Sequence, residues 1–216
     1  KKMATQKGQV FLYIPNLIGY GRVLCILIGF LESIREANPA LFLILYTSSF
    51  VLDAFDGMAA RAFNQCSQFG AVLDMVTDRF SSMALVMLLA HYYPSYATVF
   101  IFANILDFAS HWIRMYAGLF RGDLSHKTET PNQWALLKMY YDTKKRTFML
   151  VACLGHELFY IMLYAGYHYE TLMANTFYLG VLFGIMCPLW GLKHLLNLLQ
   201  LQDSSVDIVR TEQDKQ

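Results

Sequence analysis

The chain has 216 residues, of which 56% are hydrophobic and only 15% charged, and its formal net charge is +1. This balance lies outside the usual soluble range, and the near-neutral charge excludes a strongly basic nucleic-acid-binding protein. The length suits one domain. The four cysteines lack the paired spacing of zinc sites and disulfide frameworks. We therefore expect an all-α integral membrane protein.

Apolar segments recur along the chain and predict six transmembrane helices, since about 20 helical residues cross the hydrocarbon of a bilayer. A short amphipathic stretch at 8–13 precedes them and ends near Pro15, which predicts an N-terminal interfacial helix. We expect a membrane domain over 1–201 and a polar, disordered cytoplasmic tail over 202–216. The expected spans are roughly 16–31, 40–60, 74–93, 96–119, 147–167 and 172–199.

The links between the spans set the expected topology. The link 61–69 is polar, and the link 121–146 is long, charged and contains an amphipathic stretch at 134–141. Positive residues are retained on the cytoplasmic side of membranes, so their distribution predicts that both termini are cytoplasmic. Only Arg35 then lies outside, whereas the following lie on or near the cytoplasmic side: Lys7, Arg61, Arg121, Lys127, Lys138, Lys144, Lys145, Arg146, Lys193, Arg210 and Lys215.

Four aspartates stand at the cytoplasmic ends of the second and third expected spans. Asp53 and Asp56 precede the link 61–69, and Asp74 and Asp78 follow it. An ionised Asp near the bilayer interior costs about 2.5–3.5 kcal/mol on insertion scales, so four together indicate a function. Spacings of three and four residues place each pair on one helix face. We therefore expect the four carboxylates to converge.

Convergent carboxylates repel one another unless protons or a cation neutralise them. The ligand set is oxygen alone, which predicts Mg²⁺ or Mn²⁺ rather than zinc. Such a site favours a phosphate or diphosphate substrate. The aspartates could instead pair with Arg61 and Arg79 as a contact between helices, or carry cations in a transporter. Their position beside a loop and an Arg disfavours a permeation path.

A longer pattern surrounds the aspartates. It reads Asp53-x-x-Asp56-Gly57-x-x-Ala60-Arg61, then eight residues, then Gly70-x-x-x-Asp74-x-x-x-Asp78. This pattern resembles the signature of the CDP-alcohol phosphotransferases without a gap, and Pro15-Asn16 with Arg22 is also similar to that family. The stretch 52–79 and the short chain most resemble the eukaryotic phosphatidylinositol synthases within it. A prenyl-diphosphate enzyme, which also uses aspartate-bound Mg²⁺, would lack the second half of this pattern.

The resemblance implies an enzyme that passes a phosphatidyl group from CDP-diacylglycerol to an alcohol and releases CMP. It implies Mg²⁺ or Mn²⁺ as the cofactor, a homodimer, and an endoplasmic reticulum membrane location with the active site facing the cytoplasm. By the same resemblance, Asp78 is the catalytic base on the attacking hydroxyl. The implied metal ligands are Asp53, Asp56, Asp74 and Asp78, and the residues implied to hold the CDP part are Gly57, Arg61 and Ser67.

The fourth expected span carries a polar stripe of Asn104, Asp107, His111 and Arg114 at helical spacing. An alcohol with many hydroxyls needs many donors and acceptors. The stripe, together with the basic end of the link at 144–146, therefore predicts myo-inositol as the acceptor. Glycerol-3-phosphate is the alternative acceptor, because the basic residues could hold its phosphate. The stripe could also simply connect helices.

Overall fold

The computed structural model describes residues 9–122, 134–141 and 147–215, and all regular structure within them is helical, as expected. The chain forms two compact units, Lys1–Ala84 and Leu85–Gln216. Helix α4 (Gln68–Tyr92) begins in the first unit and ends in the second. The basic cluster at 144–146 lies outside the described residues.

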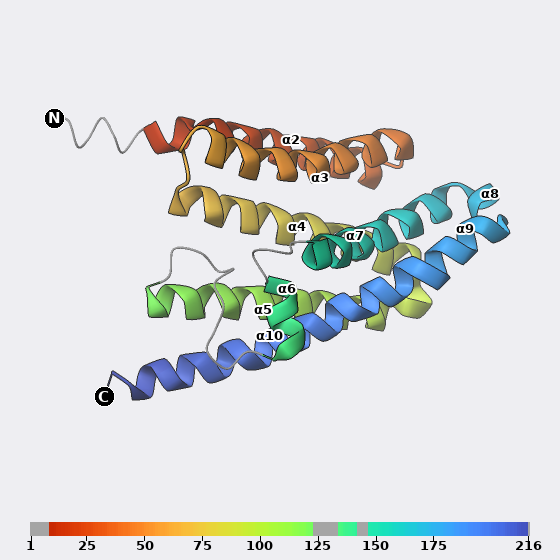
Figure 1. The fold of residues 1–216 in the computed structure, drawn as a ribbon. Coiled ribbons are helices and arrows are strands. Elements are labelled where there is room, and N and C mark those ends of the chain that lie inside the picture. Colours follow the sequence, from red (N-terminus) through yellow and green to blue (C-terminus); the bar gives the residue numbers. More distant parts are fainter. Residues whose placement is uncertain (1–8, 123–133, 142–146, 216) are drawn as a thin grey trace. The chain divides into compact units, whose positions relative to one another are not determined.

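The first unit contains the 3₁₀ helix η1 (Val10–Leu12), helices α2 (Ile14–Ile34) and α3 (Pro39–Ala62), and most of α4. Helices α2 and α3 lie side by side (Figure 1). Asn38 starts α3 because its Oδ1 accepts a hydrogen bond from Leu41 N at 3.0 Å, and proline fits the first turn that follows. This tight turn makes the two helices antiparallel neighbours.

The N-terminal segment folds back onto the link between α3 and α4. Asn16 Nδ2 donates to Val10 O at 2.6 Å, and Ile14 N donates to Gln65 Oε1 at 2.8 Å. The η1 helix covers only part of the stretch at 8–13, where we expected an interfacial helix. Its location at a membrane surface stays a prediction.

The second unit is built around the long C-terminal helix α10 (Cys187–Gln213), which lies along α5 (Ala97–Arg121) and α7 (Thr147–His168) in Figure 1. Its core joins α6 to α7 and α10 through Leu137, Tyr140, Tyr141, Ala152 and Leu196. The remaining elements are η2 (Pro94–Tyr96), α6 (Ala135–Tyr141), α8 (Glu170–Met173), α9 (Thr176–Val181) and the π-helical turn η3 (Leu182–Met186).

Helix α10 corrects one expectation from the sequence. The segment from 202 onward, which we expected to be disordered, continues as helix through Gln213. Its polar side chains contact α5: Asp207 forms an ion pair with Arg121, and Lys215 Nζ donates to Phe120 O at 3.0 Å. The polarity of this segment therefore reflects a charged helix–helix contact, which composition alone cannot distinguish from disorder.

Two residues of the polar stripe on α5, Asp107 and Arg114, contact α10. Arg114 Nη1 lies 3.1 Å from Asp203 Oδ2, and Asn197 Nδ2 donates to Asp107 Oδ1 at 2.8 Å. All four of these side chains are buried. Of the two interpretations of the stripe, these contacts favour the connection between helices over an acceptor pocket.

Breaking the Arg114–Asp203 pair should destabilise the second unit. Removing one partner of a buried ion pair costs about 3–5 kcal/mol, because the other charge stays buried. We therefore expect Arg114→Met to lower the thermal midpoint in detergent. The double variant Arg114→Met/Asp203→Leu should recover most of the loss, whereas Arg210→Met, at an exposed position of α10, should have little effect. An equal loss in the single and double variants would contradict this account of the pair.

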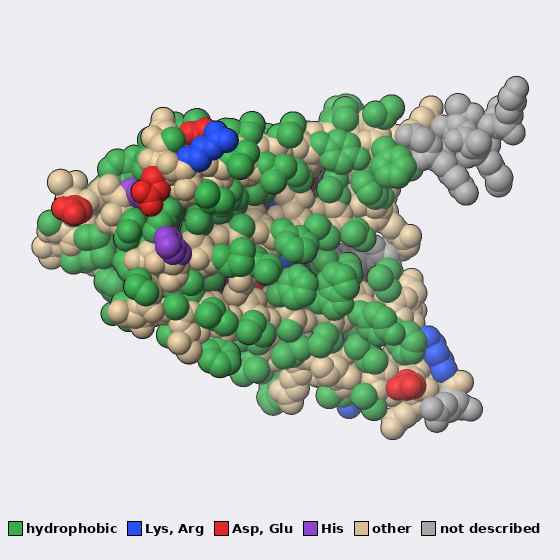
Figure 2. Space-filling view, turned by 180° about the vertical axis from the view of Figure 1, so that it is seen from behind, with side chains coloured by type: hydrophobic (Ala, Val, Ile, Leu, Met, Phe, Trp, Pro, Cys, Tyr) green, Lys and Arg blue, Asp and Glu red, His purple; other side chains and the backbone are tan. Residues whose placement is uncertain are grey.

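The apolar helices identify an integral membrane protein. Within the part of the chain that the structure describes, four helices are long and apolar enough to cross a membrane, and α4 with the segment Pro94–Arg121 passes the same test only as a bent pair. Figure 2 shows hydrophobic side chains over most of one face, with few charged side chains among them. Apolarity thus supports four or five spans rather than the expected six, because α4 and α5 carry charged residues such as Asp74, Asp78, Asp107 and Arg114.

Candidate functional site

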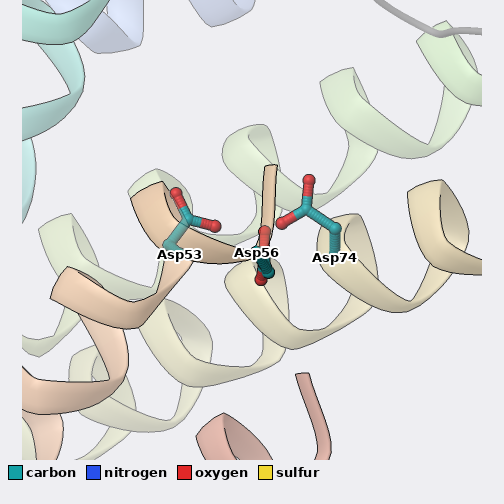
Figure 3. A group of neighbouring side chains, drawn as sticks. All are labelled: Asp53, Asp56 and Asp74. Atoms are coloured by element: carbon teal, nitrogen blue, oxygen red, sulfur yellow. The ribbon is translucent and has the colours of Figure 1, made fainter. Parts of the chain in front are cut away.

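The site lies in the first unit, where the C-terminal half of α3 meets the first half of α4. Asp53 and Asp56 project from α3 and Asp74 projects from α4, and Figure 3 shows the three carboxylates facing one another. One ligand oxygen from each lies within 4.8 Å of the others. Asp56 is the most enclosed, at 8% exposed. The predicted convergence is therefore found for these three aspartates.

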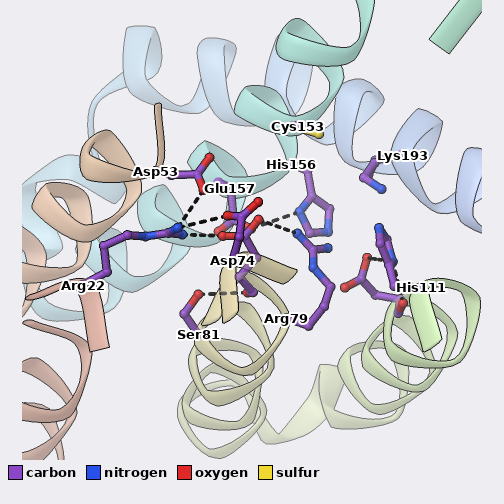
Figure 4. Close-up of polar contacts among 12 residues, drawn as sticks. Arg22, Asp53, Asp74, Arg79, Ser81, His111, Cys153, His156, Glu157 and Lys193 are labelled. Atoms are coloured by element: carbon purple, nitrogen blue, oxygen red, sulfur yellow. Dashed lines mark hydrogen bonds and ion pairs between the residues drawn. The ribbon is translucent and has the colours of Figure 1, made fainter. Parts of the chain in front are cut away.

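A cation from α2 occupies the centre of the carboxylates. Arg22 Nη1 lies 2.8 Å from Asp53 Oδ1, 2.8 Å from Asp56 Oδ2 and 3.1 Å from Asp74 Oδ1. Its Nη2 donates to Asp78 Oδ1, so one guanidinium contacts all four aspartates. Figure 4 shows Arg22 pointing toward Asp53 and Asp74. The Arg22 side chain is 2% exposed. The cluster thus already holds one positive charge away from water.

From the sequence, Arg22 is part of the family resemblance but has no expected role. The signal that could have identified its role is its position in the middle of an apolar span. A charged side chain there is expensive unless it has a partner, and is by default a candidate functional residue.

The donor chemistry fits a hard divalent ion. Oxygens bound to one Mg²⁺ at about 2.1 Å lie at most about 4.2 Å apart. The three carboxylate oxygens lie within 4.8 Å of one another, close to this limit. Small side-chain movements would therefore bring all three onto one ion. The guanidinium among them shows that the cluster attracts positive charge, and the ligand set fits the expected Mg²⁺ or Mn²⁺.

Asp78 differs from the other three aspartates in its neighbours. It lies outside the group of three, on the Nη2 side of Arg22, and its second oxygen lies 3.8 Å from Arg79 Nη2. Its backbone carbonyl accepts a hydrogen bond from Ser81 Oγ at 2.9 Å. Asp78 therefore lies next to the group of three, and its part in holding the metal stays a prediction.

The residues expected to hold CDP lie at the facing ends of the same two helices. A Cβ added at Gly57 would lie 3.5 Å from Arg61 Nη1, an ordinary contact distance, so packing within the protein does not itself require glycine here. Arg61 is exposed. Ser67 Oγ accepts a hydrogen bond from Gly70 N at 3.0 Å and so caps the first turn of α4. Their contact with a nucleotide stays a prediction.

Gly70 is required by its contact with the N-terminal segment. A Cβ added at Gly70 would lie 2.9 Å from Asn16 Oδ1, closer than real Cβ contacts allow. Asn16 is 1% exposed and also donates to Val10 O. The glycine of the pattern therefore allows α2 to lie against the start of α4, which places Arg22 within reach of the aspartates.

Comparisons with known proteins agree with the pattern around the aspartates. A family model described as CDP-alcohol phosphatidyltransferase matches residues 12–186. The chain is similar to the CDP-diacylglycerol–inositol 3-phosphatidyltransferase of Candida albicans, with 42% identity over 98% of this chain and 88% of the relative. It is also similar to the human protein of that name, with 38% identity over 89% of each chain. A probable Arabidopsis thaliana member is 40% identical over 99% of this chain and 98% of its own length. No solved structure gives a significant match.

Proposed function

The chain belongs to the CDP-alcohol phosphatidyltransferase family, and we infer that it transfers a phosphatidyl group from CDP-diacylglycerol to inositol, giving phosphatidylinositol and CMP. The observation that carries this conclusion is the near full-length similarity to relatives with that named activity. The carboxylate cluster of the first unit supplies the matching chemistry, since a diphosphate substrate needs its charge neutralised.

Asp53, Asp56 and Asp74 would hold the divalent ion, with Asp78 at its edge. When bound, Mg²⁺ or Mn²⁺ would stabilise the negative charge that develops on the departing CMP. The protein's own contribution is to fix two carboxylates on α3 and one on α4 so that their oxygens face one point. This fixed geometry costs little rearrangement during the reaction.

Asp78 is the proposed general base. A neutral inositol hydroxyl loses its proton as its oxygen attacks the phosphorus next to diacylglycerol. A new oxygen–phosphorus bond forms, the phosphorus–oxygen bond to CMP breaks, and Asp78 takes the proton. Arg22 Nη2 donates to Asp78 Oδ1, which keeps that oxygen oriented. The other carboxylate oxygen faces Arg79 at a longer distance of 3.8 Å.

Gly57, Arg61 and Ser67 are the proposed contacts for the CDP part. The exposed guanidinium of Arg61 presents a planar fork that suits phosphate oxygens. Gly57 keeps the backbone bare beside the metal ligands. Ser67 Oγ accepts from Gly70 N, so its hydroxyl proton is still available to donate to a ligand.

The membrane topology follows from charge distribution. We propose six spans, with α4 and α5 crossing separately and with both termini and the active site on the cytoplasmic side of the endoplasmic reticulum. The segment at 8–13 would then lie along that interface. This arrangement leaves the nucleotide in water and the two acyl chains in the leaflet. A homodimer is the proposed assembly.

The acceptor is tested with the purified protein and one CDP-diacylglycerol. We expect labelled myo-inositol to be converted at a higher kcat/KM than glycerol-3-phosphate, serine, choline or ethanolamine. Unlabelled inositol should compete with the other alcohols and suppress their slower conversion. A preference for glycerol-3-phosphate would keep the family assignment and reject inositol as the acceptor.

A further inference from the structure

Arg22 occupies the position that the proposed metal ion needs. Its Nη1 lies between 2.8 and 3.1 Å from one oxygen of each of Asp53, Asp56 and Asp74. An ion bound through these three oxygens at about 2.1 Å per ligand would lie among the atoms that Arg22 now contacts. Two desolvated cations would then face each other across one set of ligands. The position of Arg22 and an ion bound through these oxygens therefore exclude each other.

A second feature makes this position of Arg22 energetically costly. The Nε of Arg22 is buried and has no hydrogen-bond partner among the described residues. An unpaired buried donor is penalised, because it has lost water without gaining an acceptor. The guanidinium nitrogens Nη1 and Nη2 thus contact the carboxylates, while Nε of the same side chain is left without an acceptor. A small shift along the long side chain could exchange one set of contacts for another.

We propose that Arg22 is an exchangeable internal counter-ion of the active site. In the metal-free protein its guanidinium offsets part of the negative charge of the four carboxylates and holds α2, α3 and α4 together. When the ion binds, Nη1 leaves Asp53, Asp56 and Asp74, while Nη2 keeps its contact with Asp78. This inference rests on the proposed metal site and adds a competitor for the ion on α2.

Contact with Arg22 stabilises the buried carboxylates before the ion binds. Four uncompensated carboxylates on two neighbouring helices would repel one another and resist burial. Arg22 removes part of this repulsion and so favours the folded, metal-free protein. The same contact weakens metal binding, because the ion must displace a charge-assisted set of hydrogen bonds.

The test compares Arg22→Gln with Arg35→Gln in protein freed of metal by a chelator. Arg35 is exposed at the C-terminal end of the same helix and serves as the matched control. Mn²⁺ binding is measured by electron paramagnetic resonance, and the thermal midpoint is recorded with and without Mn²⁺. We expect Arg22→Gln to have a lower thermal midpoint than the control when metal is absent. We expect it to bind Mn²⁺ about tenfold more tightly, which is equivalent to about 1.4 kcal/mol. Added Mn²⁺ should therefore raise its thermal midpoint by more than that of the control.

Unchanged or weaker Mn²⁺ binding in Arg22→Gln would overturn the exchange while leaving the proposed metal site intact. Failure of the wild-type protein to bind Mn²⁺ would overturn the metal site itself and the exchange with it. If Arg22→Gln cannot be isolated without metal, Mn²⁺ binding is measured on Arg22→Lys instead. Lysine keeps the charge but has a single nitrogen, so we expect tighter Mn²⁺ binding by a smaller factor. Weaker binding there would also overturn the exchange.

Discussion

Asp78→Asn is expected to bind CDP-diacylglycerol normally but to lose at least about 100-fold in kcat, the usual contribution of a general base. Asparagine has the same shape and can still accept a hydrogen bond from Arg22 through its oxygen, but it cannot take a proton from inositol. The helices and the nucleotide contacts should therefore be preserved. The measurement is turnover at saturating inositol, together with CDP-diacylglycerol binding to the same preparation.

The control for this variant is Asp214→Asn, since Asp214 is exposed at the end of α10. Its kcat should match the wild type. A kcat of Asp78→Asn within a few-fold of the wild type would show that Asp78 is not the base. If Asp78→Asn lost CDP-diacylglycerol binding as well as turnover, Asp78 would instead be a residue that binds the substrate.

Asp56→Asn should show the largest loss of metal affinity among the candidate ligand variants. Asp56 is the most buried of the three converging aspartates and contacts Arg22 at 2.8 Å. Removing an outer contact of a metal ligand typically costs 10–100-fold in affinity, so removal of a ligand itself should cost at least about 100-fold. We expect turnover at ordinary Mg²⁺ to fall accordingly, and excess Mn²⁺ to restore part of it.

Metal dependence separates the two aspartate roles. Raised Mn²⁺ should help Asp56→Asn, whereas it should not restore Asp78→Asn, because no amount of metal replaces the missing base. EDTA should abolish wild-type turnover, and Mg²⁺ or Mn²⁺ should restore it. Full activity of the wild-type protein in EDTA would reject Asp53, Asp56 and Asp74 as ligands of a required ion.

Local spacing was enough to predict how the aspartates meet. Intervals of three and four residues fix a common helix face, and a short polar link makes the two helices neighbours. Asp53, Asp56 and Asp74 accordingly converge. Helical periodicity gives the face of a residue but not its partner on a distant helix. The contact between Arg22 and Asp78, separated by 56 residues, was missed for this reason.

Because periodicity does not identify distant partners, the sequence also left the contacts of the second unit unpredicted. The stripe containing Asp107 and Arg114 was visible in the sequence, but its partners Asn197 and Asp203 lie about 90 residues further along the chain. These contacts engage side chains that we had considered for acceptor binding, and Asp203 lies in the segment that we had expected to be disordered. The polar residues of α4 and α5 lower the apolarity that identifies a span, so apolarity alone identifies four or five spans among the described residues.

The most direct test of the proposed function is product stoichiometry with the purified protein, CDP-diacylglycerol, myo-inositol and Mg²⁺ or Mn²⁺. We predict that phosphatidylinositol and CMP form in equal amounts, and that neither forms when inositol is omitted or EDTA is added. CMP release that does not depend on inositol, or the absence of phosphatidylinositol under these conditions, would contradict the account.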